Sequence, residues 1–172
     1  VLVMATATTA AGTYSSPSQR IVADAVHQTT AVLRGSFAQS GNVRQELQAL
    51  DFIASRVDLF KFQEPAEELR LDWEVSDDYG KTHLRFAQTY QGLRVWGCKK
   101  YVHFDSTGAI YLVAGQNVAT PSISTTPAIS VSEAERLAYV DAQPILGYRA
   151  VRSENELLIY PEGITPRLAW LI

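Results

Sequence analysis

Residues 82–97 read T-H-L-R-F-A-Q-T-Y-Q-G-L-R-V-W-G, and this stretch decides how the chain folds. From Leu84 to Tyr90, alternate residues (L, F, Q and Y) fall on one side, which is the pattern of a half-buried strand. Gln91 and Gly92 follow where the chain has to reverse. The stretch therefore predicts a β-hairpin.

The alternation continues on both sides of this hairpin. It begins at Leu69, and turn-forming residues recur at 77–80, 91–92 and 105–108. These connections are too short for crossovers, so neighbouring strands must be antiparallel. The sequence predicts a β-meander of four strands, near 69–76, 82–90, 94–104 and 109–114.

Two helical patterns precede these strands. Between Ile21 and Leu33, apolar residues recur at intervals of three and four, and Gly35 would end the helix. A second apolar stripe runs from Leu47 to Val57. We therefore expect two amphipathic helices before any strand, placed to cover one face of the sheet.

The segment 115–130 differs in composition from its neighbours. It contains Pro121 and Pro127 and no charged residue. Proline fixes φ and favours extended conformations in the residue before it. We expect an extended, exposed connector that marks a domain boundary.

A second, smaller unit follows the connector. Ser130 and Glu133 form a capping box, which predicts a helix that runs to about Ala142, ahead of Pro144. Two apolar stretches, near 157–160 and 168–172, then predict strands.

Composition argues against several classes of protein. The 172 residues carry a net charge of −3 and a pI near 5.6, so there is no overall basic field to hold nucleic acid. No apolar run approaches the roughly 20 residues of a membrane-spanning helix. Val1–Ala7 is apolar and has the A-x-A pattern of a signal-peptide tail, but it lacks a positive front end. A signal remnant and a frayed terminus both stay open, and we expect residues 1–17 to be flexible.

No pattern in the sequence predicts catalysis. A zinc peptidase of the H-E-x-x-H type needs two histidines one helical turn apart with a glutamate beside the first, and this motif is absent. A G-x-S-x-G nucleophile elbow and a glycine-rich phosphate loop are also absent. We predict no catalytic residue, no cofactor-binding residue and no metal ligand.

The histidines and the single cysteine fit structural roles. His27, His83 and His103 are far apart in sequence. With the predicted turn, His83 would face about Lys100, and His103 would lie well past it, so the two would not easily share a metal. Cys98 has no partner for a disulfide and is expected to be a small buried residue on a strand.

Charge is distributed unevenly along the predicted meander. Residues 64–78 contain seven acidic residues and one basic residue, whereas residues 81–100 contain five basic residues and no acidic one. These runs either neutralise one another across strands or form a polarised surface that steers a partner.

The aromatic residues between Tyr79 and Phe104 leave a similar choice between the core and an apolar patch for a partner. Gln88, which shares a face with apolar residues, needs a hydrogen-bond partner.

The hairpin also resembles a known family. H-x-R-F-x-Q-x-Y at His83–Tyr90, continued by Q-G and by V-x-G at Val95–Gly97, is similar to the core of the fungalysin/thermolysin propeptide domain. S-E-A at Ser132–Ala134 and P-R-L-A-W at Pro166–Trp170 resemble the PepSY domain that follows this core in thermolysin-like metalloproteases. Together the two resemblances cover about residues 63–172.

The sequence departs from the family pattern in two places. Leu93-Arg94-Val95 stands where a proline before the valine is usual. The chain also ends directly after the R-L-A-W strand, where such families continue with another strand, a cleavage junction and the protease. We therefore expect a truncated propeptide.

The resemblance implies a binding role without catalysis. It implies a propeptide that acts as intramolecular chaperone and inhibitor of a secreted thermolysin-like zinc metalloprotease. Its partner would be the catalytic domain, bound non-covalently, in a secreted or periplasmic location, with no nucleic acid or membrane partner. A free-standing, secreted PepSY-type binding or protease-inhibitor module is the alternative.

The expected fold class is α+β. We expect an antiparallel β-meander covered by helices, followed by a second small α+β PepSY-like unit. The expected divisions are a flexible N-terminus (1–17), helices plus the propeptide core sheet (18–114), the extended linker (115–130) and a partial PepSY domain (131–172).

Overall fold

The structure is a computed structural model that describes residues 15–16, 19–37, 43–146 and 155–172. Most of the expected flexible N-terminus, 1–17, lies outside the described residues. The strands are β1 (Ser15–Ser16), β2 (Gln19–Asp24), β3 (Thr29–Phe37), β4 (Leu69–Ser76), β5 (Thr82–Tyr90), β6 (Leu93–Phe104), β7 (Ile110–Ala114), β8 (Glu156–Tyr160) and β9 (Arg167–Leu171). The helices are α1 (Gln45–Ala54), α2 (Val57–Phe60), α3 (Pro65–Glu68) and α4 (Val131–Leu146).

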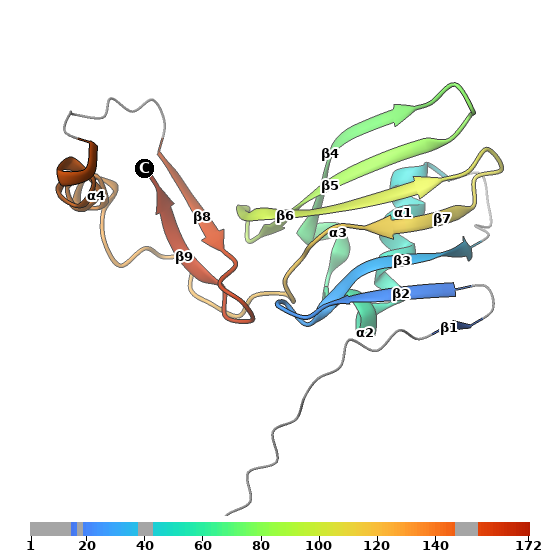
Figure 1. The fold of residues 1–172 in the computed structure, drawn as a ribbon, viewed down its shortest axis with the longest axis horizontal. Coiled ribbons are helices and arrows are strands. Elements are labelled where there is room, and N and C mark those ends of the chain that lie inside the picture. The colour runs from blue at the N-terminus through green and yellow to red at the C-terminus, as the bar shows by residue number, and fades with distance from the viewer. Residues whose placement is uncertain (1–14, 17–18, 38–42, 147–154) are drawn as a thin grey trace, which may run out of the picture.

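Most strands form one curved antiparallel sheet in the order β1-β2-β3-β7-β6-β5-β4 (Figure 1). The predicted meander is confirmed, because β4, β5, β6 and β7 are antiparallel neighbours in chain order. At one end of the sheet, β8 pairs in parallel with β6 through Val95 and Ile159, and β9 pairs antiparallel with β8. The predicted α+β class is confirmed.

The helix predicted between Ile21 and Leu33 is wrong, because this segment forms the β2–β3 hairpin. Half of the apolar residues here are β-branched, and Thr29 and Thr30 add two more β-branched side chains, which favours strands over helices. The turn is fixed by Asp24, whose Oδ1 accepts the N–H groups of Val26 at 2.9 Å and His27 at 3.2 Å. The predicted stop, Gly35, lies inside β3. Strands therefore come before the first helix.

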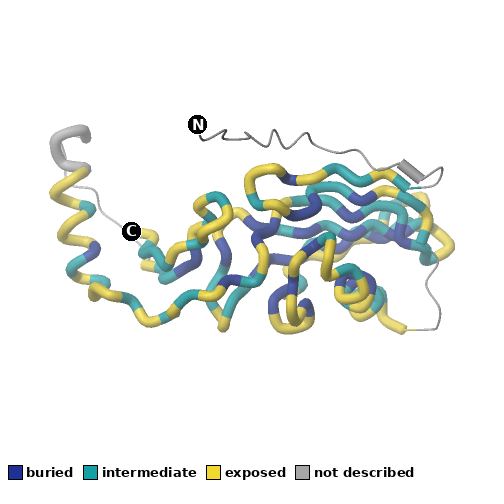
Figure 2. Tube along the Cα trace, turned by 90° about the horizontal axis from the view of Figure 1, so that it is seen from below, coloured by how far each residue is buried: buried dark blue, intermediate teal, exposed yellow. Residues whose placement is uncertain are grey.

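Three helices, α1 to α3, lie against one face of the sheet (Figure 2). The second predicted helix is confirmed as α1, although it ends at Ala54 and the chain then enters the short α2 and α3. The side chains between helices and sheet form the main core: Leu33, Ala49, Phe52, Ile53, Phe60, Phe62, Leu69, Leu84, Phe86, Val102, Phe104, Ile110 and Val113.

The C-terminal region, residues 122–172, contains α4 and the β8–β9 hairpin. Half of the predicted capping box is present: Ser130 Oγ accepts the Glu133 N–H at 3.2 Å, whereas the Glu133 carboxylate binds Arg136. The helix passes the predicted stop near Ala142 and continues to Leu146. An apolar cavity of about 430 Å³ separates α4 from the hairpin, lined among others by Ile129, Ala134, Leu137, Leu157, Leu168 and Trp170.

Candidate functional site

The β5–β6 hairpin turns where the sequence predicts. Gln91 and Gly92 have φ values of 48° and 82°, and a type I′ turn requires positive φ at both central residues. Leu84, Phe86 and Gln88 are fully buried on the inward face of β5, as their alternation predicts.

Beyond the turn, the register of the hairpin changes. Thr89 pairs with Arg94, but Ala87 pairs with Lys99, so two steps along β5 are matched by five along β6. The extra residues form an irregularity in which Gly97 adopts a φ of 70°, a value that favours glycine. This irregularity includes the residue through which β6 pairs with β8.

The change of register overturns the prediction that His83 faces about Lys100. His83 lies directly opposite His103, and their Nδ1 atoms are 2.7 Å apart. His83 Nε2 also lies 3.3 Å from Asp77 Oδ2. Burial and the neighbouring His83 lower the pKa of His103, which favours a neutral acceptor nitrogen in the pair. Within the described residues, no group of three or more His, Cys, Asp or Glu side chains is placed to hold a metal.

Gln88 fixes the start of the connector to the sheet. Its Nε2 donates to the Val118 carbonyl at 2.9 Å, and its Oε1 accepts the Val118 N–H at 3.1 Å. Asn117 Nδ2 donates to the Phe60 carbonyl at 2.6 Å, and Thr29 Oγ1 donates to the Asn117 carbonyl at 2.9 Å. Asn117 and Val118 are buried, in contrast to the exposed connector that the composition predicts, because these amides satisfy backbone groups that no strand pairs.

Lys100, at the end of the basic run 81–100, is a buried cation. It is 1% exposed, and its Nζ donates to the carbonyls of Thr30 and Gly115, each at 2.6 Å. Burial lowers the pKa of Lys100 to about 7. These two carbonyls accept hydrogen bonds from the Lys100 ammonium group, whose donors would otherwise be unpaired in the core.

The backbone around Lys100 is closely packed. Gly115 has a φ of 104°, and a Cβ at this position would lie 2.2 Å from the Lys99 carbonyl oxygen, so only glycine fits. The signal for burial of Lys100 was present in the sequence. Every second residue of this part of β6 points inward, and Lys100 falls in that series with Cys98, Val102 and Phe104.

Cys98 is buried as predicted. It is 3% exposed, and burial raises the pKa of its thiol to about 11. A thiol with so high a pKa is almost wholly protonated near neutral pH and is therefore a poor nucleophile.

The charged runs neutralise one another only in part. Arg85 Nε on β5 lies 2.7 Å from Asp72 Oδ1 on β4, which is the predicted cross-strand pairing. Glu68 instead turns inward, where its Oε1 accepts the N–H groups of Gln63 and Glu64, each at 2.9 Å. Lys99 makes no ion pair with any described residue. The structure therefore shows both features that the sequence left open: neutralisation across strands at Arg85 and Asp72, and an unpaired surface cation at Lys99.

The aromatic residues divide between the core and the surface. Phe86 and Phe104 are fully buried in the core. Tyr79, in the β4–β5 turn, is 79% exposed, and Trp96, in the irregular part of β6, is 40% exposed. Trp73 on β4 is 43% exposed beside Arg85. These three rings are available to a partner.

Comparison with known proteins agrees with the geometry of the sheet. Residues 67–117 match the Fungalysin/Thermolysin Propeptide Motif, a segment that runs from α3 through β4–β7 to the buried Asn117. This chain carries the fungalysin/thermolysin propeptide motif. The predicted resemblance to a thermolysin-like propeptide is confirmed.

The similarity extends beyond the motif. The proteins named thermolysin from Alicyclobacillus acidocaldarius subsp. acidocaldarius and from Bacillus caldolyticus are each 30% identical over 151 residues, which is 83% of this chain and 27% of each relative. The thermostable neutral protease NprT of Geobacillus stearothermophilus is 24% identical over 165 residues, 91% of this chain and 30% of its own length. The chain thus spans between a quarter and a third of these relatives. The matches support a protease propeptide role, and the PepSY assignment of residues 131–172 stays a prediction.

Among the described helices, none is long and apolar enough to cross a membrane.

Proposed function

We propose that this chain is the propeptide portion of a secreted thermolysin-like metalloprotease precursor, and that it assists folding of the catalytic domain and then inhibits it. The observation that carries the proposal is the propeptide motif over residues 67–117, within a similarity to thermolysins that covers 83% of the chain. The role needs no reactive group in this chain. It needs a stable surface that binds the folded protease.

Both parts of the proposed role follow from binding. A partner that binds the folded protease and not its unfolded chain stabilises the folded form by mass action. Within one precursor the two parts meet at an effective concentration of about millimolar, so modest affinity is sufficient. Bound domains that cover the substrate cleft also exclude substrate. The complex would be secreted or periplasmic.

The first test is the coding sequence of the precursor. The proposal requires a metalloprotease domain with an H-E-x-x-H motif in the same reading frame, whereas a free-standing binding module requires none. Without such a domain, the propeptide role would be abandoned in favour of the binding module.

The second test is refolding in trans. Denatured catalytic domain is diluted with and without this chain, and the recovered peptidase activity and the complex on size-exclusion chromatography are measured. We expect a higher yield and a one-to-one complex with the wild-type chain, and neither with the Phe86→Ala variant under conditions where that variant is unfolded. Equal yields and no complex with the wild type would contradict the proposal.

A further inference from the structure

The sheet has a second face that α1 to α3 do not cover (Figure 2). Paired residues of neighbouring strands point to the same side, so the register identifies this face. The inward row contains core residues from β3, β7, β6 and β5: Leu33, Val113, Val102 and Leu84. The next row points the other way and crosses six strands: Arg20, Arg34, Leu112, His103, His83 and Val75.

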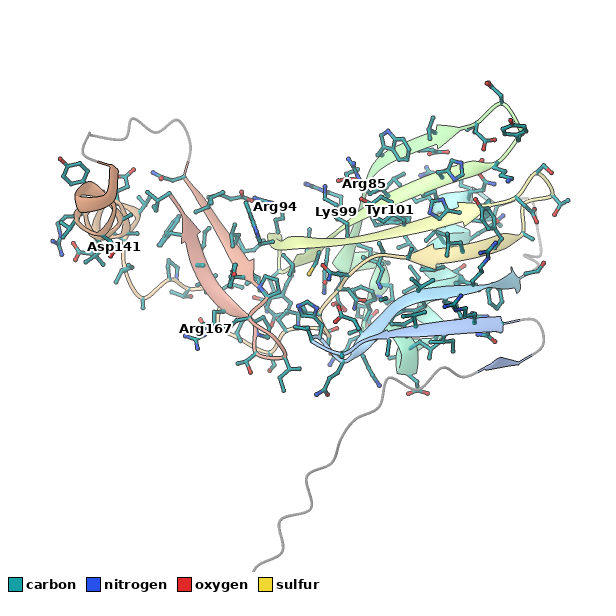
Figure 3. The ribbon with its side chains drawn as sticks, in the orientation of Figure 1. Arg85, Arg94, Lys99, Tyr101, Asp141 and Arg167 are labelled. Carbon is teal, nitrogen blue, oxygen red and sulfur yellow. The ribbon has the colours of Figure 1, made fainter. Side chains whose placement is uncertain are left out.

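Two more rows complete this outward face, which we call the open face. One contains Val22, Val32, Ala114, Tyr101, Arg85 and Trp73, and the other contains Lys99, Ala87 and Arg70. Arg85, Lys99 and Tyr101 lie together on it in Figure 3. The three rows hold five cationic side chains and no acidic one, although the chain as a whole has a net charge of −3.

Most of these cations have no partner in the described part of the chain. Asp72 reaches the face at the β4 irregularity and pairs with Arg85. Arg20 and Arg34 are both exposed, lie directly opposite each other on β2 and β3, and form no ion pair with a described residue. Like charges directly opposite on neighbouring strands destabilise a sheet. An acidic group bound between them would remove that repulsion.

The other residues of the open face favour a protein as the source of this acidic group. Trp73 and Tyr101 stand beside the guanidinium of Arg85, and arginine with aromatic residues is the composition of protein–protein hot spots. A nucleic acid would also meet the negative charge of the rest of the chain. The face is large enough for a specific complex. Six strands about 4.8 Å apart and the nine residues of β5 at about 3.4 Å each give roughly 700 Å², close to the roughly 800 Å² per partner of a standard interface.

We propose that the open face is the docking surface for an acidic patch on the protease catalytic domain, with Arg20, Arg34 and Lys99 as its unpaired cations. This inference rests on the proposed function and adds the face and the charge of the contact. Electrostatic complementarity of this kind speeds association and fixes the orientation of the two proteins.

The test separates binding from stability. Arg34→Glu replaces a like-charge contact with Arg20 by an opposite-charge pair, so the fold should be as stable as the wild type or more stable. Binding to the catalytic domain of the same precursor, measured by surface plasmon resonance in 50 mM NaCl, should weaken by about tenfold or more. Lys99→Glu should act in the same direction. Wild-type affinity should fall as NaCl is raised to 500 mM, because salt screens the contact.

The control changes net charge equally on the opposite side. Arg44, at the start of α1, is 75% exposed on its side chain, and its only ion pair with a described residue is with Glu46, two residues along the chain. Arg44→Glu should bind within about twofold of the wild type, because α1 covers the other face. A matched titration with a 20-base-pair DNA duplex distinguishes a general polyanion site from a protein site.

Each outcome decides the inference. If Arg34→Glu and Lys99→Glu bind the protease as well as the wild type does, the open face is not the docking surface, and the proposed function stands unaffected. If they lose only DNA binding, the face is a nucleic-acid site and the inference is overturned. If the wild-type chain does not bind the protease at all, the proposed function fails and the inference fails with it.

Discussion

The sheet region, residues 19–118, and the C-terminal region have hydrophobic cores of very different size. One cluster of thirteen buried apolar residues fills the space between the sheet and helices α1 to α3. The second cluster has four buried members, and only Ile159 belongs to the C-terminal region, since the others come from β6 and the connector. In α4, the apolar Leu137 and Val140 are 45% and 57% exposed. The sheet region can therefore fold by itself, whereas the C-terminal region depends on β6 for its core.

The largest expected effect tests this inequality directly. Phe86 is fully buried in the main core, so Phe86→Ala should lower the free energy of unfolding by about 3–5 kcal/mol. The matched truncation Leu137→Ala in α4 should change it by less than about 0.5 kcal/mol, because the side chain is already 45% exposed. Urea unfolding followed by circular dichroism measures both. Equal losses would show that α4 is packed as well as the sheet and would break the comparison.

The next effect concerns the segment that joins the two regions. In Gln88→Leu, the buried N–H of Val118 loses its acceptor and the Val118 carbonyl keeps only the Asn117 Nδ2 donor at 3.1 Å, which should cost about 1–3 kcal/mol. The connector should then open, so limited proteolysis should cut near 116–120 sooner than in the wild type. Thr89→Ala, which removes a longer 3.2 Å bond at an exposed position, is the control and should leave the cutting rate unchanged. Unchanged rates in both variants would show that Gln88 does not hold the connector.

A pH effect should be confined to the sheet region. Burial lowers the pKa of Lys100 to about 7, below its ordinary value of 10.5, so the unfolded state binds more protons between these values. Stability should therefore rise with pH, by about 2 kcal/mol between pH 7 and 9. Above pH 9 the rise should become shallower, because burial raises the pKa of Cys98 from 9.0 to about 11 and the folded thiol then holds a proton that the unfolded thiol has lost.

Lys100→Met tests the origin of this slope. The variant keeps an unbranched side chain, one atom shorter, and removes the titrating amine, so the rise in unfolding free energy between pH 7 and 9 should disappear. Thermal unfolding at pH 7, 8 and 9 gives the comparison. A slope that persists in the variant would assign the pH effect to another group.

The sequence could predict the strands whose limits are set by local signals. The turns at 77–80, 91–92 and 105–108 have strong chemistry of their own, and the four strands they bound appear as expected. The β2–β3 hairpin could not be assigned in this way, because apolar spacing around Ile21 and Val32 suits a helix as well as a strand. Pairing of β3 with β7, distant in sequence, decides between them.

The candidate site was less predictable than the fold. The need of Gln88 for a hydrogen-bond partner could be read from its buried position, but its partner Val118 lies 30 residues away. The pairing of His83 with His103 depends on extra residues in β6 that only Gly97 signals. The open face likewise depends on β2 and β3, which the sequence placed in a helix. Each miss is a long-range pairing that local patterns do not contain.

The smallest effect concerns the contact between the two regions. Arg94 on β6 binds Glu156 on β8 through two hydrogen bonds, one of which joins Nε and Oε1 at 2.9 Å, and Figure 3 shows Arg94 at the junction. This bond raises the pKa of Arg94 and lowers the pKa of Glu156, so both stay charged at neutral pH. Both side chains are more than a third exposed, so solvent screens the pair and a double-mutant cycle of Arg94→Ala and Glu156→Ala should give a coupling of only about 0.5–1 kcal/mol. Because α4 supplies little core, hydrogen exchange in β8 and β9 should be faster in either single variant than in the wild type. Exchange in β4 and β5 should be unchanged. A coupling near zero would mean that the pairing of Val95 with Ile159 and the apolar cluster around it hold the C-terminal region to the sheet without help from this ion pair.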